Sequence, residues 1–125
     1  MAPEQAGFWK ASGLAEWSAG NLELSARDLF QASTLYFQRG DLAKALELCE
    51  KILEFDPDHV AAHLLCGECK LDLGLDAEAD EHLRLVLDSQ PGHPKATRLF
   101  EALNYRKKTF RGLKASSELI GQSLS

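Results

Sequence analysis

Apolar residues recur along the chain at intervals of three and four positions, the spacing of a helix that buries one face. Residues 42–55 show this stripe most clearly, in Ala45, Leu48, Cys49, Ile52 and Leu53. Gly40 follows a similar pattern over 26–39, and Pro57 follows the pattern over 42–55, so both helices are expected to end there. No segment alternates strictly between apolar and polar residues, as a half-buried strand would. The pattern predicts an all-α protein built from antiparallel helix pairs.

The pattern repeats when the chain is shifted by 34 positions. Gly40 then coincides with Gly74, and Pro57 coincides with Pro91. Further coincidences are Ala45 with Ala79, Leu53 with Leu87, and His59 with His93. Each unit consists of two predicted helices that are joined at the glycine and closed at the proline. A period of this length indicates a repeat protein in which helix hairpins stack on one another.

These anchors resemble the tetratricopeptide repeat, whose 34-residue unit favours particular residue types at fixed positions. With Ala26 as its first position, the first unit matches at Ser33, Tyr36, Gly40, Ala45, Ile52 and Pro57. The second unit begins at Val60 and matches at Gly67, Gly74, Ala79, Val86 and Pro91. It departs from the family at Lys70, where an aromatic residue is expected. A third unit would begin at Pro94, but it departs from the pattern at Glu101, Asn104 and Lys108.

The resemblance implies a fragment of an α-solenoid with two full repeats, at 26–59 and 60–93. We predict that residues 94–108 form a capping helix with the register of a first repeat helix, and that residues 109–125 form a basic C-terminal tail. The N-terminal segment 1–25 is expected to supply another capping helix. The apolar face of that helix comprises Phe8, Trp9, Leu14 and Trp17. It would either fold across the binding groove of the repeats or leave the groove open to a partner.

Charge is divided unevenly along the chain, which has a net charge of −5. Residues 1–93 carry seven basic and seventeen acidic side chains, a net charge of −10, whereas residues 94–125 carry seven basic and two acidic side chains, a net charge of +5. The basic end would contact anionic lipid, nucleic acid or an acidic protein surface, or it would stabilise the end of a helix. The acidic body argues against nucleic acid. Head-to-tail association of the two ends into a homo-oligomer is a further alternative.

The composition is that of an ordinary globular protein, with 45% hydrophobic and 26% charged residues. No apolar run is long enough to span a bilayer, and the start of the chain lacks the basic and apolar regions of a secretory signal. The three cysteines are an odd number, which fits thiols in a reducing compartment better than a disulfide framework. We therefore expect a cytoplasmic protein.

Cys66 and Cys69 form a Cys-x-x-Cys pair that follows His63 closely in the sequence. Such a pair would be a redox centre if it lay at a helix N-terminus, where the helix dipole lowers the thiol pKa. One cysteine would instead join His59 and His63 in a metal site. The pair lies near the middle of a predicted helix with no strand before it, and the spacing supplies no third convergent ligand.

We therefore predict that Cys66 and Cys69 pack in the core, on the same side of their helix as Leu65 and Leu73. We predict no metal and no other cofactor. The sequence contains no glycine-rich phosphate loop, no nucleophile elbow and no motif that pairs carboxylates for catalysis. The chain is therefore not expected to be an enzyme.

In tetratricopeptide proteins the first helix of each repeat lines a concave binding surface. Carried over by position, the resemblance implies a groove that contains Arg27, Phe30, Thr34, Phe37, Leu64, Glu68, Leu71, Lys95 and Arg98. The phenylalanines and leucines of this groove would contact apolar groups of a partner, and its cations would select the charge of the partner. Family members that clamp the C-terminal carboxylate of a chaperone use positions that hold Phe30, Thr34, Leu65, Lys95 and Leu99 in this chain. Lys95 alone matches, so a carboxylate clamp is not expected.

We hypothesise that the chain is a protein-interaction adaptor or assembly chaperone that binds a partner peptide or amphipathic helix in the concave groove. The first alternative is a scaffold that assembles with itself through its oppositely charged ends. The second alternative is a thiol or metal sensor that uses Cys66, Cys69 and His63.

Overall fold

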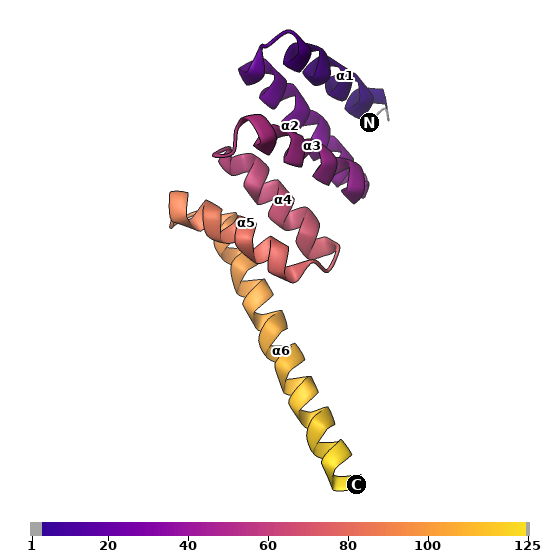
Figure 1. Ribbon diagram of the computed structural model, residues 1–125, viewed down its shortest axis with the longest axis vertical. Coiled ribbons are helices and arrows are strands. Elements are labelled where there is room, and N and C mark those ends of the chain that lie inside the picture. The colour runs from indigo at the N-terminus through magenta and orange to yellow at the C-terminus, as the bar shows by residue number, and fades with distance from the viewer. Residues whose placement is uncertain (1–3, 125) are drawn as a thin grey trace.

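The computed structural model describes residues 4–124, with side chains described for residues 5–109. Its elements are α1 (Glu4–Ser18), α2 (Leu22–Gln38), α3 (Leu42–Phe55), α4 (Val60–Asp72), α5 (Asp76–Ser89) and α6 (Pro94–Leu124). Consecutive helices run antiparallel and stack into an elongated array, and α6 continues beyond the stack (Figure 1). The predicted all-α repeat architecture is confirmed. None of the described helices has both the length and the apolar character that crossing a membrane requires.

Three of the turns between helices share one geometry, which is centred on a glycine. Gly20, Gly40 and Gly74 have φ angles of 83°, 83° and 78°, a left-handed conformation that side chains with a Cβ disfavour. In each turn the residue after the glycine donates its N–H to the carbonyl group five positions earlier. These bonds join Asn21 to Glu16 (2.8 Å), Asp41 to Tyr36 (2.9 Å) and Leu75 to Lys70 (2.8 Å). The glycine-terminated hairpins expected at Gly40 and Gly74 are confirmed, and Gly20 adds one that the period did not reveal.

The additional hairpin, α1–α2, is built on the same plan as α2–α3. The Ser25 hydroxyl donates to the Gly13 carbonyl across the first hairpin (2.7 Å), and the Ser33 hydroxyl donates to the Ala45 carbonyl across the second (2.6 Å). A Cβ atom on Gly13 would lie only 2.7 Å from the Leu29 side chain, so the helices cross closely there. Helix α2 therefore serves two hairpins, and for this reason it begins at Leu22, before the predicted start at 26.

Two clusters of buried side chains hold the array together. The first contains side chains from α1, α2, α3 and α4, and it includes Leu29, Leu48 and Ile52, each at most 2% exposed. The second joins α4, α5 and α6 through Leu71, Ala79, Leu83 and Leu103. Leu73 was expected on the packed side of α4 but is 44% exposed, so that expectation is wrong. Its position at the C-cap explains the difference, because the helical register no longer directs a residue inward once the helix has ended.

Helix α6 occupies the place of a first repeat helix, and among the described residues no second helix folds back on it. Its Glu101 and Asn104 correspond in register to residues that face the second helix in the earlier repeats, and both are polar here. Glu101 is exposed and Asn104 is half-buried. The structure also differs from the predicted end of this helix near 108, since α6 runs on to Leu124. No proline interrupts residues 95–124, so the sequence contains no strong helix stop.

Candidate functional site

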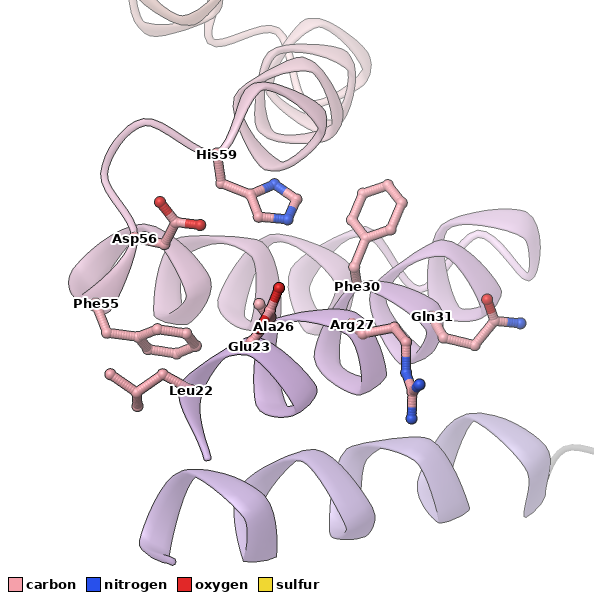
Figure 2. A pocket seen from close by; sticks show the side chains of 9 residues that line it. All are labelled: Leu22, Glu23, Ala26, Arg27, Phe30, Gln31, Phe55, Asp56 and His59. Atoms are coloured by element: carbon pink, nitrogen blue, oxygen red, sulfur yellow. The ribbon is translucent and has the colours of Figure 1, made fainter. Parts of the chain in front are cut away.

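The face formed by α2, α4 and α6 contains three neighbouring hollows. The first has a volume of about 550 Å³ and lies between α2 and the connection from α3 to α4. Its lining residues, drawn in Figure 2, are Leu22, Glu23, Ala26, Arg27, Phe30, Gln31, Phe55, Asp56 and His59. The rings of Phe30 and His59 lie beside each other at one edge, with 5.9 Å between their centroids, and Leu22 and Phe55 close the opposite end.

The second hollow, called here the central hollow, lies between α2, α4 and the start of α6. It has a volume of about 300 Å³ and is lined by Phe30, Thr34, Phe37, Gln38, Ala61, Leu64, Leu65, Glu68 and Lys95. Phe30 lines this hollow as well as the first, so the two are adjacent. Most of its wall is apolar, and Phe37 and Leu64 are half-buried, so both retain surface that a partner can cover.

The third hollow, called here the α6 hollow, lies between the end of α4 and the middle of α6. It has a volume of about 640 Å³ and is lined by Leu71, Asp72, Leu99, Ala102, Leu103, Tyr105, Arg106 and Thr109. Its Tyr105 is 75% exposed. Together the three hollows follow the face from α2 to α6.

The structure gathers most of the predicted groove residues along this line. Arg27 lines the first hollow, and Leu71 lines the α6 hollow. The central hollow contains Phe30, Thr34, Phe37, Leu64, Glu68 and Lys95. Arg98 is exposed and lines none of the three. Whether these side chains contact a partner stays a prediction.

The sequence-based list omitted Phe55 at the end of α3, and Asp56 and His59 in the connection from α3 to α4. The family pattern assigns groove positions to the first helix of each repeat, and it therefore misses residues that come from the end of a second helix or from a connection. The sequence contains one signal for this region, because His59 recurs as His93 one repeat later. In both places the histidine Nδ1 accepts the backbone N–H three residues later, from Ala62 at 3.0 Å and from Ala96 at 3.2 Å. These histidines cap α4 and α6.

The charges at the central hollow are partly balanced within the chain. Lys95 of α6 pairs with Glu68 of α4 at 2.8 Å, and the Glu68 side chain is only 16% exposed. Arg27 pairs with Asp28 at 3.3 Å, but its side chain remains 70% exposed. The middle of the surface is therefore close to neutral, and Arg27 is the exposed cation at its α2 end.

The three cysteines lie in the core, as predicted for Cys66 and Cys69. Cys49, Cys66 and Cys69 are all fully buried free thiols, and the Sγ atoms of Cys66 and Cys49 are 2.8 Å apart. The hydrogen bond with Cys66 raises the pKa of Cys49, and burial adds to it. The hydrogen bond with Cys49 and burial raise the pKa of Cys69. Because the thiolate is the reactive form, these pKa directions argue against a thiol sensor.

His63 belongs to a network of polar side chains that interact with one another between α3, α4 and α5. Its Nε2 lies 2.6 Å from the Pro57 carbonyl, which can only accept, so Nε2 carries the proton and Nδ1 is an acceptor in the neutral ring. His82 Nδ1 donates to that nitrogen at 3.0 Å, and His82 Nε2 accepts from Lys70 at 3.1 Å. Lys70 also pairs with Glu50 at 3.5 Å. This hydrogen-bonded network occupies the position where the family places an aromatic ring, and it supplies the buried Lys70 with partners there.

Neither nitrogen of His63 is directed to a cysteine, so the structure does not assemble the proposed ligand set of His59, His63 and one cysteine. Among the described residues, no group of three or more histidine, cysteine, aspartate or glutamate side chains is placed to hold a metal ion.

Comparison with known proteins identifies related sequences. The family model described as tetratricopeptide repeat matches residues 36–103. The BBSome complex member BBS4 of Bos taurus is 34% identical over 77 residues, which cover 60% of this chain. The match covers 15% of that relative, so the chain corresponds to a small part of its length.

Several solved structures share the fold. The Hsp90 co-chaperone Cns1 from Saccharomyces cerevisiae has a TM-score of 0.67 and 12% identity, covering 96% of this chain and 45% of that one. The first tetratricopeptide domain of Spaghetti (RPAP3), bound to the HSP90 peptide SRMEEVD, has a TM-score of 0.60 and 16% identity, covering 86% and 97%. The Sgt2 domain from Aspergillus fumigatus has a TM-score of 0.61 and 18% identity, covering 88% and 83%. At these identities the likeness shows the fold alone.

Proposed function

Because this chain belongs to the tetratricopeptide repeat family, we propose that it is a protein-interaction adaptor that binds a peptide or amphipathic helix of a partner on the face formed by α2, α4 and α6. The observation that carries the proposal is the central hollow, where Phe30, Phe37 and Leu64 form a half-buried apolar wall. An apolar side chain of a partner that enters this hollow gains about 25 cal/mol for each Å² removed from water.

The wall of the central hollow is preorganised, which favours binding. Phe30 and Phe37 pack against the first core cluster, and Leu64 packs against the second, so little side-chain freedom remains to be lost when a partner arrives. Arg27 adds an exposed cation at the α2 end of the surface, suited to an acidic residue beside the apolar anchor of the partner.

The surface is poorly suited to the recognition of a terminal carboxylate. The RPAP3 domain is bound to a peptide that ends in Glu-Glu-Val-Asp, but the corresponding clamp positions here include Phe30, Thr34 and Leu65. The matching cation, Lys95, is already paired with Glu68. We therefore assign recognition to apolar contact. The relative BBS4 is named as a member of a protein complex, which supports an adaptor role within a larger assembly.

The proposal is tested by blocking the central hollow without disturbing the core. Thr34→Arg places a long cation in the hollow, and Ala43→Arg places the same side chain on an exposed position of α3. Each tagged protein is used to capture partners, which are quantified by mass spectrometry after thermal melts confirm that both variants fold. We expect the partners of the wild type to be lost with Thr34→Arg and retained with Ala43→Arg. Equal capture by both variants would show that binding does not use this face.

A further inference from the structure

The sequence of α6 places apolar residues at helical spacing from Leu99 to Leu124, a pattern called here the stripe. Moving by alternate steps of four and three residues from Leu99, the positions hold Leu99, Leu103, Arg106, Phe110, Leu113, Ser117, Ile120 and Leu124. Six of these eight residues are apolar. An average step of 3.5 residues keeps such a stripe against a second helix that runs alongside, as in a coiled coil.

The first part of the stripe is used inside the domain. Leu103 is fully buried in the second core cluster, and Leu99 packs against that cluster. Arg106 pairs with Asp76 and also donates to the Leu71 carbonyl at 3.4 Å. Beyond this point α6 runs away from α5, and Figure 1 shows no other described helix beside it. The register positions from Phe110 onward thus continue a packing pattern for which this chain supplies no second helix in the described part.

The α6 hollow lies where the stripe leaves the domain. Leu99 and Leu103 of the stripe line it, together with Ala102 and the exposed Tyr105. The α6 hollow and the exposed residues of α6 up to Thr109 are together called here the α6 ledge, and the register positions from Phe110 onward follow it along the same helix. An apolar hollow that opens along a helix suits a helix of a partner rather than a compact ligand.

Charge decides between a second copy of this chain and a different protein. Residues 106–114 contain five cations and no anion: Arg106, Lys107, Lys108, Arg111 and Lys114. Asp76 and Asp80 pair with the first two. Packing two copies of α6 side by side would bring these cations together, which is unfavourable, whereas a helix flanked by carboxylates would neutralise them.

From this geometry and charge we infer that the α6 ledge binds an amphipathic helix of another protein, whose apolar stripe is flanked by aspartate and glutamate. The inference rests on the proposed function of this face and adds to it the α6 hollow, which shares no lining residue with the central hollow. The two surfaces can be separated experimentally.

The test uses synthetic helical peptides as the probe. One peptide repeats a heptad with leucine at the a and d positions and glutamate at the flanking e and g positions, and the control peptide has lysine at those flanks. Binding to the full chain is followed by fluorescence anisotropy. We expect the glutamate peptide to bind at least about tenfold more tightly than the lysine peptide, with an affinity that falls as salt screens the charges. Equal affinities, or no binding of either peptide, would overturn the inference.

Variants locate the bound peptide. Ala102→Glu places an anion in the α6 hollow, whereas Ala43→Glu makes the same substitution at an exposed position of α3, away from α6. We expect Ala102→Glu to weaken binding about tenfold and Ala43→Glu to change it less than about threefold. Similar losses in both variants would reduce the effect to general electrostatics and overturn the assignment.

Two further measurements distinguish the ledge from other surfaces. Thr34→Arg should leave the affinity for the glutamate peptide unchanged, because Thr34 lines the central hollow. Loss of binding in that variant would place the peptide in the central hollow and overturn the ledge while leaving the proposed function intact. Sedimentation of the free chain should show a monomer, and a dimer abolished by Ala102→Glu would identify a second copy as the occupant and refute the inference.

Discussion

At the scale of single residues, Gly13 is a position where the fold has no room for a side chain. A Cβ atom there would lie 2.7 Å from the Leu29 side chain and 3.0 Å from the Leu29 nitrogen, whereas a Cβ atom on Gly7 in the same helix would meet nothing within 4 Å. We expect Gly13→Ala to lower the free energy of unfolding by about 1–2 kcal/mol, because overpacking outweighs the gain in helix propensity.

Gly7→Ala is the matched control for this prediction. It should leave stability unchanged or raise it by up to about 1 kcal/mol, because alanine favours a helix over glycine. Urea unfolding of the two variants at one pH provides the comparison. If Gly13→Ala proves as stable as Gly7→Ala, the close crossing of α1 and α2 is incorrect.

His82 makes stability depend on pH. Burial lowers the pKa of His82 to about 4, and electrostatic interaction with Lys70 and His63 adds to this effect. The unfolded chain has the ordinary value of 6.5, so between pH 6.5 and 4 it binds a proton that the folded chain does not. The free energy of unfolding should therefore decrease as pH falls through this window and level off below it. The shift corresponds to at most about 3 kcal/mol, reduced by solvent screening because the ring is half-buried.

The measurement is urea unfolding at pH 7 and pH 5 for the wild type and His82→Gln. Glutamine still accepts from Lys70 and donates to His63 but does not titrate, so the variant should lose less stability between the two pH values. Carboxylates titrate in both proteins and cancel in the difference. Identical losses in the two proteins would exclude His82 as the source of the pH dependence.

At the scale of helices, Leu103 packs α6 against the array. This side chain is fully buried beside Leu71, Ala79 and Leu83, whereas Tyr105, two positions later, is 75% exposed. Leu103→Ala should destabilise the protein by about 2–5 kcal/mol through the cavity it leaves. Tyr105→Ala should change stability by less than about 0.5 kcal/mol. Thermal unfolding that ranks the two variants in the opposite order would contradict the docking of α6.

Asp80 of α5 forms one ion pair within α5 and another with α6, and the second also holds α6 to the array. Arg84 donates to Asp80 at 2.6 Å, and Lys107 of α6 lies 3.5 Å from the same carboxylate. Although burial raises the pKa of Asp80, these cations lower it overall. Protonation of Asp80 at acidic pH therefore removes an attraction between the two helices.

The sequence pattern predicts the hairpins that repeat at 34 positions, because Gly40 and Gly74 terminate helices with equivalent residues around them. The comparison at 34 positions does not detect the α1–α2 hairpin, because α2 belongs to both hairpins and Gly20 lies only 20 positions before Gly40. The length of α6 was underestimated because its residues lose the family pattern before the helix ends.

Much of the candidate surface follows from the same register, since Phe30, Thr34 and Leu64 lie on first helices. Two kinds of information were missing from the sequence. A connection between two helices can contribute a residue to the groove, as it does with His59, although the family pattern assigns no groove position there. A charged residue can also be neutralised by another groove residue, as Glu68 neutralises Lys95. Both depend on contacts between helices, which periodicity does not encode.

At the scale of the whole molecule, the stacked hairpins present one face with a line of three neighbouring hollows, of which the central hollow has a mostly apolar wall. This arrangement predicts that the chain discriminates against terminal carboxylates. The peptide SRMEEVD, present in the RPAP3 structure, should not bind at concentrations up to about 100 μM, because a partner must gain affinity from apolar contact rather than from a carboxylate clamp. Isothermal titration calorimetry with the RPAP3 domain as positive control gives the comparison. Micromolar binding to this chain would show that the assignment of the clamp positions is wrong.

The central claim, that a partner occupies the face of α2, α4 and α6, is tested most directly by photo-crosslinking. A benzophenone amino acid is placed at Thr34 in the central hollow or at Ala43 on α3, and each protein is irradiated in complex with a partner captured by the wild type. The account predicts a covalent adduct with the partner from position 34 and none from position 43. An adduct from position 43 alone would contradict it.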